Sequence, residues 1–191
     1  MCTLGNLRLS DASIEAIVTH SKKVRKLNLA ACLGYFNGNY TRLDIASNIC
    51  SRFTTGTLTK LKNLNHLEEL NLYYCGDGKL TTCIECIAEN CPNLVSLNLG
   101  GIPLSRATIK CLADRCDKLM ALNLCGCKLF DADLKHLSRL KELISLNISS
   151  NMDLTNQGLK ILAEFKHLQK LDLFGIGQVS GFDEGNQLIF P

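Results

Sequence analysis

Cysteine and histidine are the residues of this chain whose types and spacing could support metal chemistry. Cys83 and Cys86 form a Cys-x-x-Cys pair, and Cys91 follows five residues later, which resembles half of a zinc site that needs ligands at about 2.3 Å. Cys86, Cys111 and His136 share one position in three successive helical segments. Packed helices, however, lie about 8–10 Å apart between axes. We therefore expect structural cysteines and no metal site.

Catalytic groups form no usable set along the chain. No Ser/His/Asp or Cys/His combination recurs at a spacing that a repeated fold would bring together, and Gly175-x-Gly177 precedes no helix pattern, as a phosphate loop would. His66 and His167 each stand before a strand motif, where a surface turn explains them. We expect no enzymatic activity and no cofactor. A cysteine-dependent enzyme is a remote alternative, which selective labelling of one thiol at neutral pH would favour.

The elements that position these residues follow a repeated leucine pattern. The pattern Leu-x-x-Leu-x-(Leu/Ile) occurs at Leu67/Leu70/Leu72, Leu94/Leu97/Leu99, Leu119/Leu122/Leu124, Leu143/Leu146/Ile148 and Leu168/Leu171/Leu173. The middle leucines are 27, 25, 24 and 25 residues apart, within the roughly 20–29 residues of one leucine-rich repeat. Such repeats bury their apolar faces only by stacking. The pattern predicts an α/β fold, a right-handed leucine-rich-repeat solenoid with a curved parallel sheet on the concave face and helices on the convex face.

Helices are expected between the strands. Thr82-x-x-Glu85 has the spacing of a capping box and predicts a helix that ends near Asn90. Similar starts follow at Ser105, Asp131 and Thr155. Two rows of inward apolar positions are predicted to pack against the strand leucines: Ile84, Ile109, Leu134 and Leu159, and then Ile87, Leu112, Leu137 and Leu162.

The first third of the chain is less regular. The motif fits at Leu7 and at Leu27, with a short amphipathic helix expected at residues 11–19 between them. It also fits at Leu43, which lies 27 residues before Leu70 but only 16 after Leu27. Either Leu43 belongs to a strand with a tight connection, or residues 33 to about 60 are partly an insertion loop. We favour the strand, because long structureless loops are uncommon.

The domain organisation follows from this array. We expect one domain over residues 1–191, with irregular repeats or an insertion at about 1–63, regular repeats at about 64–176 and a tail at 177–191. The tail is glycine-rich and apolar, whereas the last repeat of an array needs a polar cover. It either folds over the end of the array as an irregular cap or leaves an exposed edge.

Composition limits the partners and the compartment. The net charge of +3 is too small for nucleic-acid binding, which normally shows a basic stripe. The cluster Lys22, Lys23, Arg25 and Lys26 fits a nuclear-import or phosphate-binding patch, but a solvated repeat edge explains it better. No secretory signal and no membrane-spanning run occur. We expect a cytoplasmic or nuclear protein whose 11 cysteines are reduced thiols.

The cysteines recur at two positions of the repeat. Cys32, Cys75 and Cys127 follow the strand motif where the chain turns away, and Asn151 takes the same place in a later repeat. At this position we expect a small side chain that can form hydrogen bonds with buried backbone groups. Cys91 and Cys116 stand at helix ends, where cysteine is expected to act as a small apolar plug.

Cys91-Pro92-x-Leu-x-x-Leu-x-Leu, followed by a helix with Cys111-Leu-Ala-Asp-Arg-Cys116, resembles the cysteine-containing subfamily of leucine-rich repeats. The resemblance covers residues 67–173 well and the first 60 residues loosely, although Ile102, Leu140 and Phe165 replace the cysteines in other repeats. These repeats are best known as the substrate-binding halves of F-box proteins in cullin-type ubiquitin ligases. The resemblance implies a substrate-recognition or adaptor module, with ubiquitin-ligase components among its partners. The alternative is a regulatory repeat array from a larger receptor or sensor.

The side chains between the leucines define a candidate protein-binding face. One row is Asn28, Asn71, Asn98, Asn123, Asn147 and Asp172, which either bond to one another as a polar ladder or offer hydrogen bonds to a partner. Aromatic residues flank small ones in the next row, which suits a protein segment. The predicted concave binding residues are Lys26, Glu69, Asn71, Tyr73, Tyr74, Ser96, Asn98, Asn123, Cys125, Ser145, Asn147, Ser149, Lys170, Asp172 and Phe174.

Overall fold

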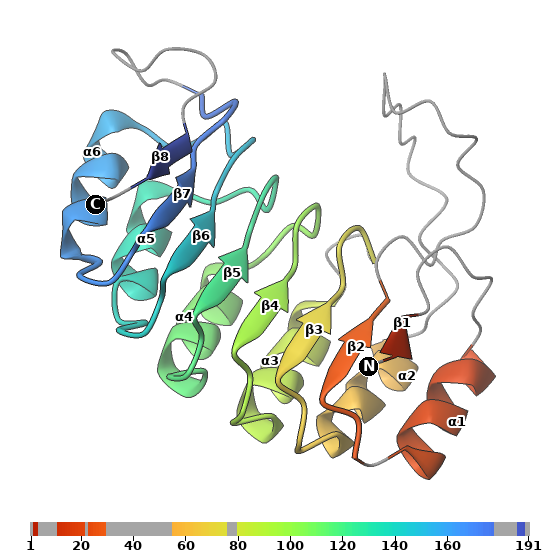
Figure 1. The fold of residues 1–191 in the computed structure, drawn as a ribbon. Coiled ribbons are helices and arrows are strands. Elements are labelled where there is room, and N and C mark those ends of the chain that lie inside the picture. Colours follow the sequence, from red (N-terminus) through yellow and green to blue (C-terminus); the bar gives the residue numbers. More distant parts are fainter. Residues whose placement is uncertain are drawn as a thin grey trace.

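The computed structural model describes residues 2–3, 11–21, 23–29, 55–75, 80–177 and 187–189. The strands in these ranges join one sheet in chain order, and helices line one side of it (Figure 1). The strands are β1 (Cys2–Thr3), β2 (Lys26–Asn28), β3 (Glu69–Asn71), β4 (Ser96–Asn98), β5 (Ala121–Asn123), β6 (Ser145–Asn147), β7 (Lys170–Asp172) and β8 (Gln187–Ile189). The predicted α/β leucine-rich-repeat solenoid is confirmed.

The register of the sheet follows the leucine motif. From β2 to β7 the strands pair in parallel, and the middle leucine of each motif lies opposite the next: Leu27, Leu70, Leu97, Leu122, Leu146 and Leu171. Each of these leucines is buried. A one-residue slip would turn them to the other face, so burial of this row fixes the register.

The strand predicted at Leu43 has no place between its expected neighbours. β2 pairs directly with β3, with Leu27 opposite Leu70, so the prediction of a strand between them was wrong. Sixteen residues after Leu27 are too few for a repeat that returns through a helix. Leu43 itself lies outside the described residues.

The first strand also differs from the prediction. Cys2 lies opposite Leu27, at the position expected for Leu7, which falls outside the described residues. The spacing explains the difference, because α1 begins at Asp11. β1 ends eight residues before that helix, as β5 ends eight residues before α5. A strand that ended near Leu9 would leave almost no chain for the turn.

The helices cover the convex side of the sheet (Figure 1). They are α1 (Asp11–His20), α2 (Thr55–Thr59), α3 (Thr81–Asn90), α4 (Arg106–Arg115), α5 (Asp131–Leu137) and α6 (Asn156–Leu159), with 3-10 segments η1 (Lys60–Asn63) and η2 (Lys160–Glu164). No helix in the described part of the chain is both long and apolar enough to span a bilayer.

The predicted helix starts are partly confirmed. Ser105 and Thr155 cap α4 and α6, since their hydroxyl oxygens accept from the backbone amides of Thr108 and Gln157. The capping box at Thr82 was wrong: α3 begins at Thr81, after an N-cap residue that makes no side-chain cap. A turn before the helix therefore ends earlier than the Thr-x-x-Glu spacing suggested, and Thr82 lies exposed within the first turn.

The core lies between sheet and helices. The two predicted helix rows are buried from α3 to α5, while Leu159 and Leu162 at the end of the array are only partly buried. Full burial of such a side chain contributes roughly 1.5–3 kcal/mol. A repeat in the middle gains this from both neighbours, and the terminal repeats gain less.

Candidate protein-binding face

The exposed face of the sheet is built from three rows of side chains that run across the strands. Parallel pairing sets the predicted residues of neighbouring repeats side by side, for example Asn98 with Asn123 and Asn123 with Asn147. Neighbouring strands lie about 4.8 Å apart. The predicted site residues of the strands therefore lie in register from strand to strand, and the helices lie on the other side of the sheet from its concave face (Figure 1).

The asparagine row is fixed by its own loops. In every repeat from β3 to β7, Oδ1 accepts from the backbone amide two residues later, at 2.9–3.1 Å: Asn71 from Tyr73, Asn98 from Gly100, Asn123 from Cys125, Asn147 from Ser149 and Asp172 from Phe174. These are Asx turns. Among these five, one bond joins neighbours, from Asn147 Nδ2 to Asp172 Oδ2 at 3.0 Å. Of the two alternatives for the row, the polar ladder is thus present between Asn147 and Asp172 and not between Asn71, Asn98, Asn123 and Asn147.

The row that begins each strand is charged at its ends. Lys26 Nζ and Glu69 Oε1 form an ion pair at 2.6 Å between β2 and β3. Ser96, Ala121 and Ser145 follow on the middle strands, and exposed Lys170 lies on β7. The ion pair is about half-exposed on both sides, and such pairs contribute little to stability. It leaves the amino-terminal end of the face without excess charge.

The row after the strands has aromatic side chains at both ends, as predicted. Tyr73 and Tyr74 contact each other edge to face, with ring centroids 4.5 Å apart. A Cβ atom on Gly100 would lie 2.7 Å from the Tyr73 ring, and one on Gly101 would lie 2.6 Å from the Tyr74 ring. The two glycines are therefore required beneath the tyrosines.

The other members of this row differ in what they can offer a partner. Phe174 is 63% exposed, which makes it the most accessible aromatic group on the face. Cys125 is half-buried, whereas Ser149 is buried and its hydroxyl donates to Asn147 Oδ1 at 2.6 Å. Ser149 thus supports the floor of the face more than it contributes contact area.

An apolar row at the amino-terminal edge of the strands was not identified from the sequence. Val95, Met120 and Ile144 directly precede β4, β5 and β6, and all three are at least partly exposed. They adjoin in space, because Met120 N donates to Val95 O and Ile144 N donates to Met120 O. The signal was present as an apolar residue after the first leucine of three successive motifs.

The turn position behind the strands is structural, as predicted. Cys75 Sγ donates to Leu29 O at 3.0 Å, and Cys127 Sγ donates to Leu99 O at 3.2 Å. Asn151 does more at the same position. Its Nδ2 donates to three backbone carbonyls, including Leu124 O at 2.9 Å, and its Oδ1 accepts from Leu129 N at 3.0 Å. Each of these side chains therefore joins its turn to the backbone of the preceding repeat.

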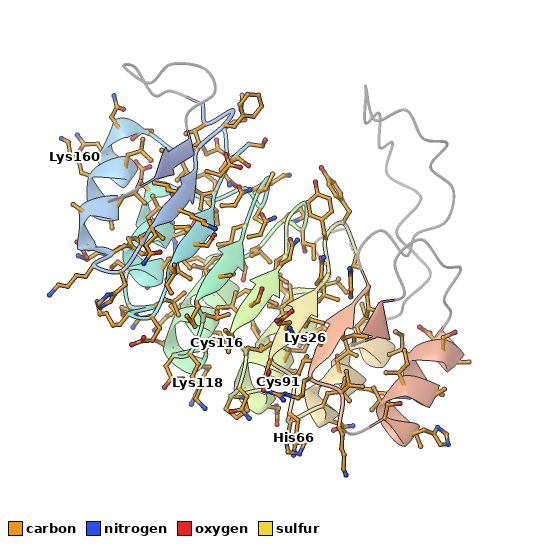
Figure 2. The ribbon with its side chains drawn as sticks, in the orientation of Figure 1. Lys26, His66, Cys91, Cys116, Lys118 and Lys160 are labelled. Atoms are coloured by element: carbon orange, nitrogen blue, oxygen red, sulfur yellow. The ribbon has the colours of Figure 1, made fainter. Side chains whose placement is uncertain are left out.

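The helix-end cysteines lie where α3 and α4 lead into the next strands (Figure 2). Cys91 and Cys116 are both buried, in agreement with the predicted apolar plug. Burial raises the pKa of Cys91 to about 11 and that of Cys116 to about 12, and it raises those of Cys83 and Cys127 to about 12. At neutral pH these thiols are protonated, which suits packing and disfavours nucleophilic chemistry.

The cysteines and the histidine that were considered as zinc ligands do not come together in the described part of the chain. No group of three cysteine, histidine or acidic side chains there has the geometry to hold a metal ion. Cys86 and Cys111 are partly exposed on neighbouring helices, and the Cys111 thiol lies 4.0 Å from the carbonyl of Glu85. The eight cysteines from Cys75 to Cys127 are free thiols.

Comparisons with known proteins agree on the fold. No family model matches the chain, and no curated protein matches its sequence. Among solved structures it is similar to a chain of the yeast Rad7–Elc1 complex, at 20% identity and a TM-score of 0.66, over 87% of this chain and 38% of that one. The chain thus spans well under half of that yeast protein.

Two further structures share the architecture. Internalin C2 of Listeria monocytogenes is 24% identical with a TM-score of 0.50, over 71% of this chain and 61% of that one. The tropomodulin C-terminal domain of Caenorhabditis elegans is 12% identical with a TM-score of 0.55, over 81% and 89%. Together with the leucine register, these similarities identify the chain as a leucine-rich-repeat solenoid.

Proposed function

We propose that this protein is a scaffold that binds another protein along its concave face. The observation that carries the proposal is the strip itself: within the described residues, no helix covers this side of the sheet, and exposed side chains of different chemistry stand in register across it. Aromatic residues dominate the energetics of protein interfaces. Phe174, at 63% exposure, is the principal anchor, and the tyrosine pair forms the opposite end.

We further propose that the scaffold serves as a substrate-recognition or adaptor module of a ubiquitin ligase in the cytoplasm or nucleus. The support is the resemblance to cysteine-containing repeats, together with the structural roles of Cys75, Cys91, Cys116 and Cys127 in this chain. The similar yeast chain comes from a complex of two proteins, Rad7 and Elc1, which agrees with a role in assembly. The free thiols fit a reducing compartment.

Affinity purification with mass spectrometry tests both levels of the proposal. The tagged chain is compared with its Tyr73→Ala, Phe174→Ala double variant, and Phe130→Ala serves as the control. Phe130 is also an exposed aromatic residue, at 50%, but it lies at the start of α5. The double variant is expected to lose the partners that Phe130→Ala retains.

Two results would count against the proposal. Equal recovery of partners by the parent and the double variant would overturn binding at the concave face. Recovery of partners without any ubiquitin-ligase component, such as Skp1 or a cullin, would overturn the adaptor role and leave the scaffold role in place. The regulatory array of a larger receptor or sensor would then be favoured.

A further inference from the structure

The three central strands present the same order of side-chain types. An apolar residue stands directly before each of β4, β5 and β6. The strand then begins with a small residue, and an asparagine follows two residues later on the same face as the small residue. The three sets are Val95, Ser96 and Asn98; Met120, Ala121 and Asn123; and Ile144, Ser145 and Asn147. We call this area the central track. It consists of an apolar edge, a shallow floor of small side chains and an amide row.

The side chains of the apolar edge are accessible to solvent. Met120 is 41% exposed, and Val95 and Ile144 are partly exposed. None of the three belongs to the hydrophobic core or to the partly buried residues packed against it. Their backbones are joined by hydrogen bonds of 2.8–2.9 Å, which makes the edge continuous over three repeats. Clustered exposed apolar side chains typically mark interaction sites.

Two of the three amides in the row offer hydrogen-bond donors to a partner, since Asn147 Nδ2 already donates to Asp172 Oδ2. The Asx turns hold Oδ1 of Asn98 and Asn123 against the backbone amides of Gly100 and Cys125. An asparagine whose oxygen is held in this way presents its NH₂ group on the other side. Neither Nδ2 atom is buried, and neither makes a hydrogen bond in the described part of the chain. The acceptors for these groups must therefore come from water or from a partner.

Among the described residues of the face, the charged side chains lie at its two ends. Lys26 and Glu69 pair at one end, and Lys170 and Asp172 stand two residues apart on β7 at the other. The nine side chains of the central track carry no charge. A strongly acidic or basic ligand gains no attraction here, whereas a neutral segment with hydrogen-bond acceptors matches the track.

We infer that the central track binds a neutral, extended polypeptide segment that lies across β4 to β6. Its apolar side chains contact Val95, Met120 and Ile144, and its main-chain carbonyl oxygens accept from the amides of Asn98 and Asn123. An α-helical segment fits less well, because its carbonyls are already bonded within the helix. Two strand spacings, about 10 Å, correspond to about three extended residues. The inference rests on the proposed concave-face function and specifies the chemistry of the partner.

Peptide selection on the whole chain tests this inference. Binders are selected from a random 12-residue phage-displayed library, and the affinities of the synthetic peptides are measured by fluorescence anisotropy. The donor variant is Asn98→Asp, Asn123→Asp, which keeps the Asx turns, since Asp172 makes the same turn with Phe174 N at 3.0 Å. It replaces each NH₂ group by a carboxylate oxygen, which repels a carbonyl.

The apolar edge is tested by Met120→Gln, with Met152→Gln as the matched control. Met152 is also exposed, at 68%, but it lies in a loop outside the track. We expect neutral peptides with apolar residues. Their affinity should fall about tenfold or more in the donor variant, since it removes two hydrogen bonds and sets a carboxylate oxygen against each carbonyl. It should fall several-fold in Met120→Gln and stay unchanged in Met152→Gln. Ester replacement of the contacted peptide bonds should weaken binding to the parent more than to the donor variant.

Several outcomes would overturn the inference: no peptide binds, the selected peptides are charged or helical, or affinity is equal in the parent and the donor variant. The purification experiment with Tyr73→Ala, Phe174→Ala remains a separate test. If that double variant loses protein partners while the peptide results fail, the concave scaffold stands and the central track is not its recognition element. If both fail, the concave face is not the binding surface.

Discussion

The connection between β2 and β3 is much longer than the one between β5 and β6, yet both join strands in the same register. Leu27 and Leu70 are 43 residues apart, whereas Leu122 and Leu146 are 24 apart. Loop-closure entropy rises only slowly with length, so the longer interval is tolerated. The difference teaches that the leucine row and its burial set the register, and that the length of the connection does not.

The largest expected effect is a loss of stability on truncation of a strand leucine, and this loss should be greater in the middle of the array than at its amino-terminal end. Leu122→Ala should lower the free energy of unfolding by about 2–5 kcal/mol, because both neighbouring repeats surround the cavity. Leu27→Ala should lie near the low end of this range, about 2 kcal/mol, since β1 beside it pairs through only two residues. Chemical denaturation of both variants measures the difference. Equal losses would show that the amino-terminal repeats are packed as well as the middle.

A second comparison uses alkaline pH, to which the buried thiols of the central repeats should respond. Burial raises the pKa of Cys116 from 9.0 to about 12, so the folded state favours the neutral thiol. The resulting stability is complete below pH 9 and is lost as pH rises towards 12. Between pH 7.5 and 10.5, the free energy of unfolding should fall by roughly 2 kcal/mol less in Cys116→Ala than in the parent. Denaturation curves at the two pH values measure this, and identical falls would contradict it.

The smallest expected effect concerns the contact that joins β2 to β3 on the concave face. The ion pair of Lys26 and Glu69 is about half-exposed, so a double-mutant cycle with Lys26→Ala and Glu69→Ala should give a coupling free energy below about 1 kcal/mol. The coupling should decrease further at high salt. A value of several kcal/mol would mean that this pair, and not the leucine row, sets the register across the long connection.

Much of the fold could be predicted because the determining residues are buried and repeated. The strand leucines and the inward helix positions recur at nearly constant spacing, and Cys75, Cys127 and Asn151 bond to backbone groups as expected. The motif at Leu43 fits the strand pattern, but it lies only 16 residues after Leu27, which is too short for a full repeat. The leucine pattern alone therefore predicted a strand that is not found between β2 and β3. The antiparallel pairing of β8 could not be predicted, since it lies outside the repeat pattern.

The candidate face could be predicted in position but not in chemistry. Strand alternation indicated which residues point outward, yet the orientation of the asparagine amides depends on Asx turns that appear only once the loops are folded. The apolar edge was missed because Glu68 and Gln169 occupy the same position in flanking repeats. A row that is apolar in only part of the array gives no signal over the whole chain.

The antiparallel strand β8 has a consequence for how the array can grow. Stacked repeats resemble a one-dimensional polymer in which each parallel strand exposes an edge for the next. β8 pairs with β7 through Leu188 opposite Leu171, and it occupies the backbone groups that another parallel repeat would use. It therefore acts as a chain terminator: addition of a further repeat, from this molecule or from a second copy, requires β8 to leave the sheet first.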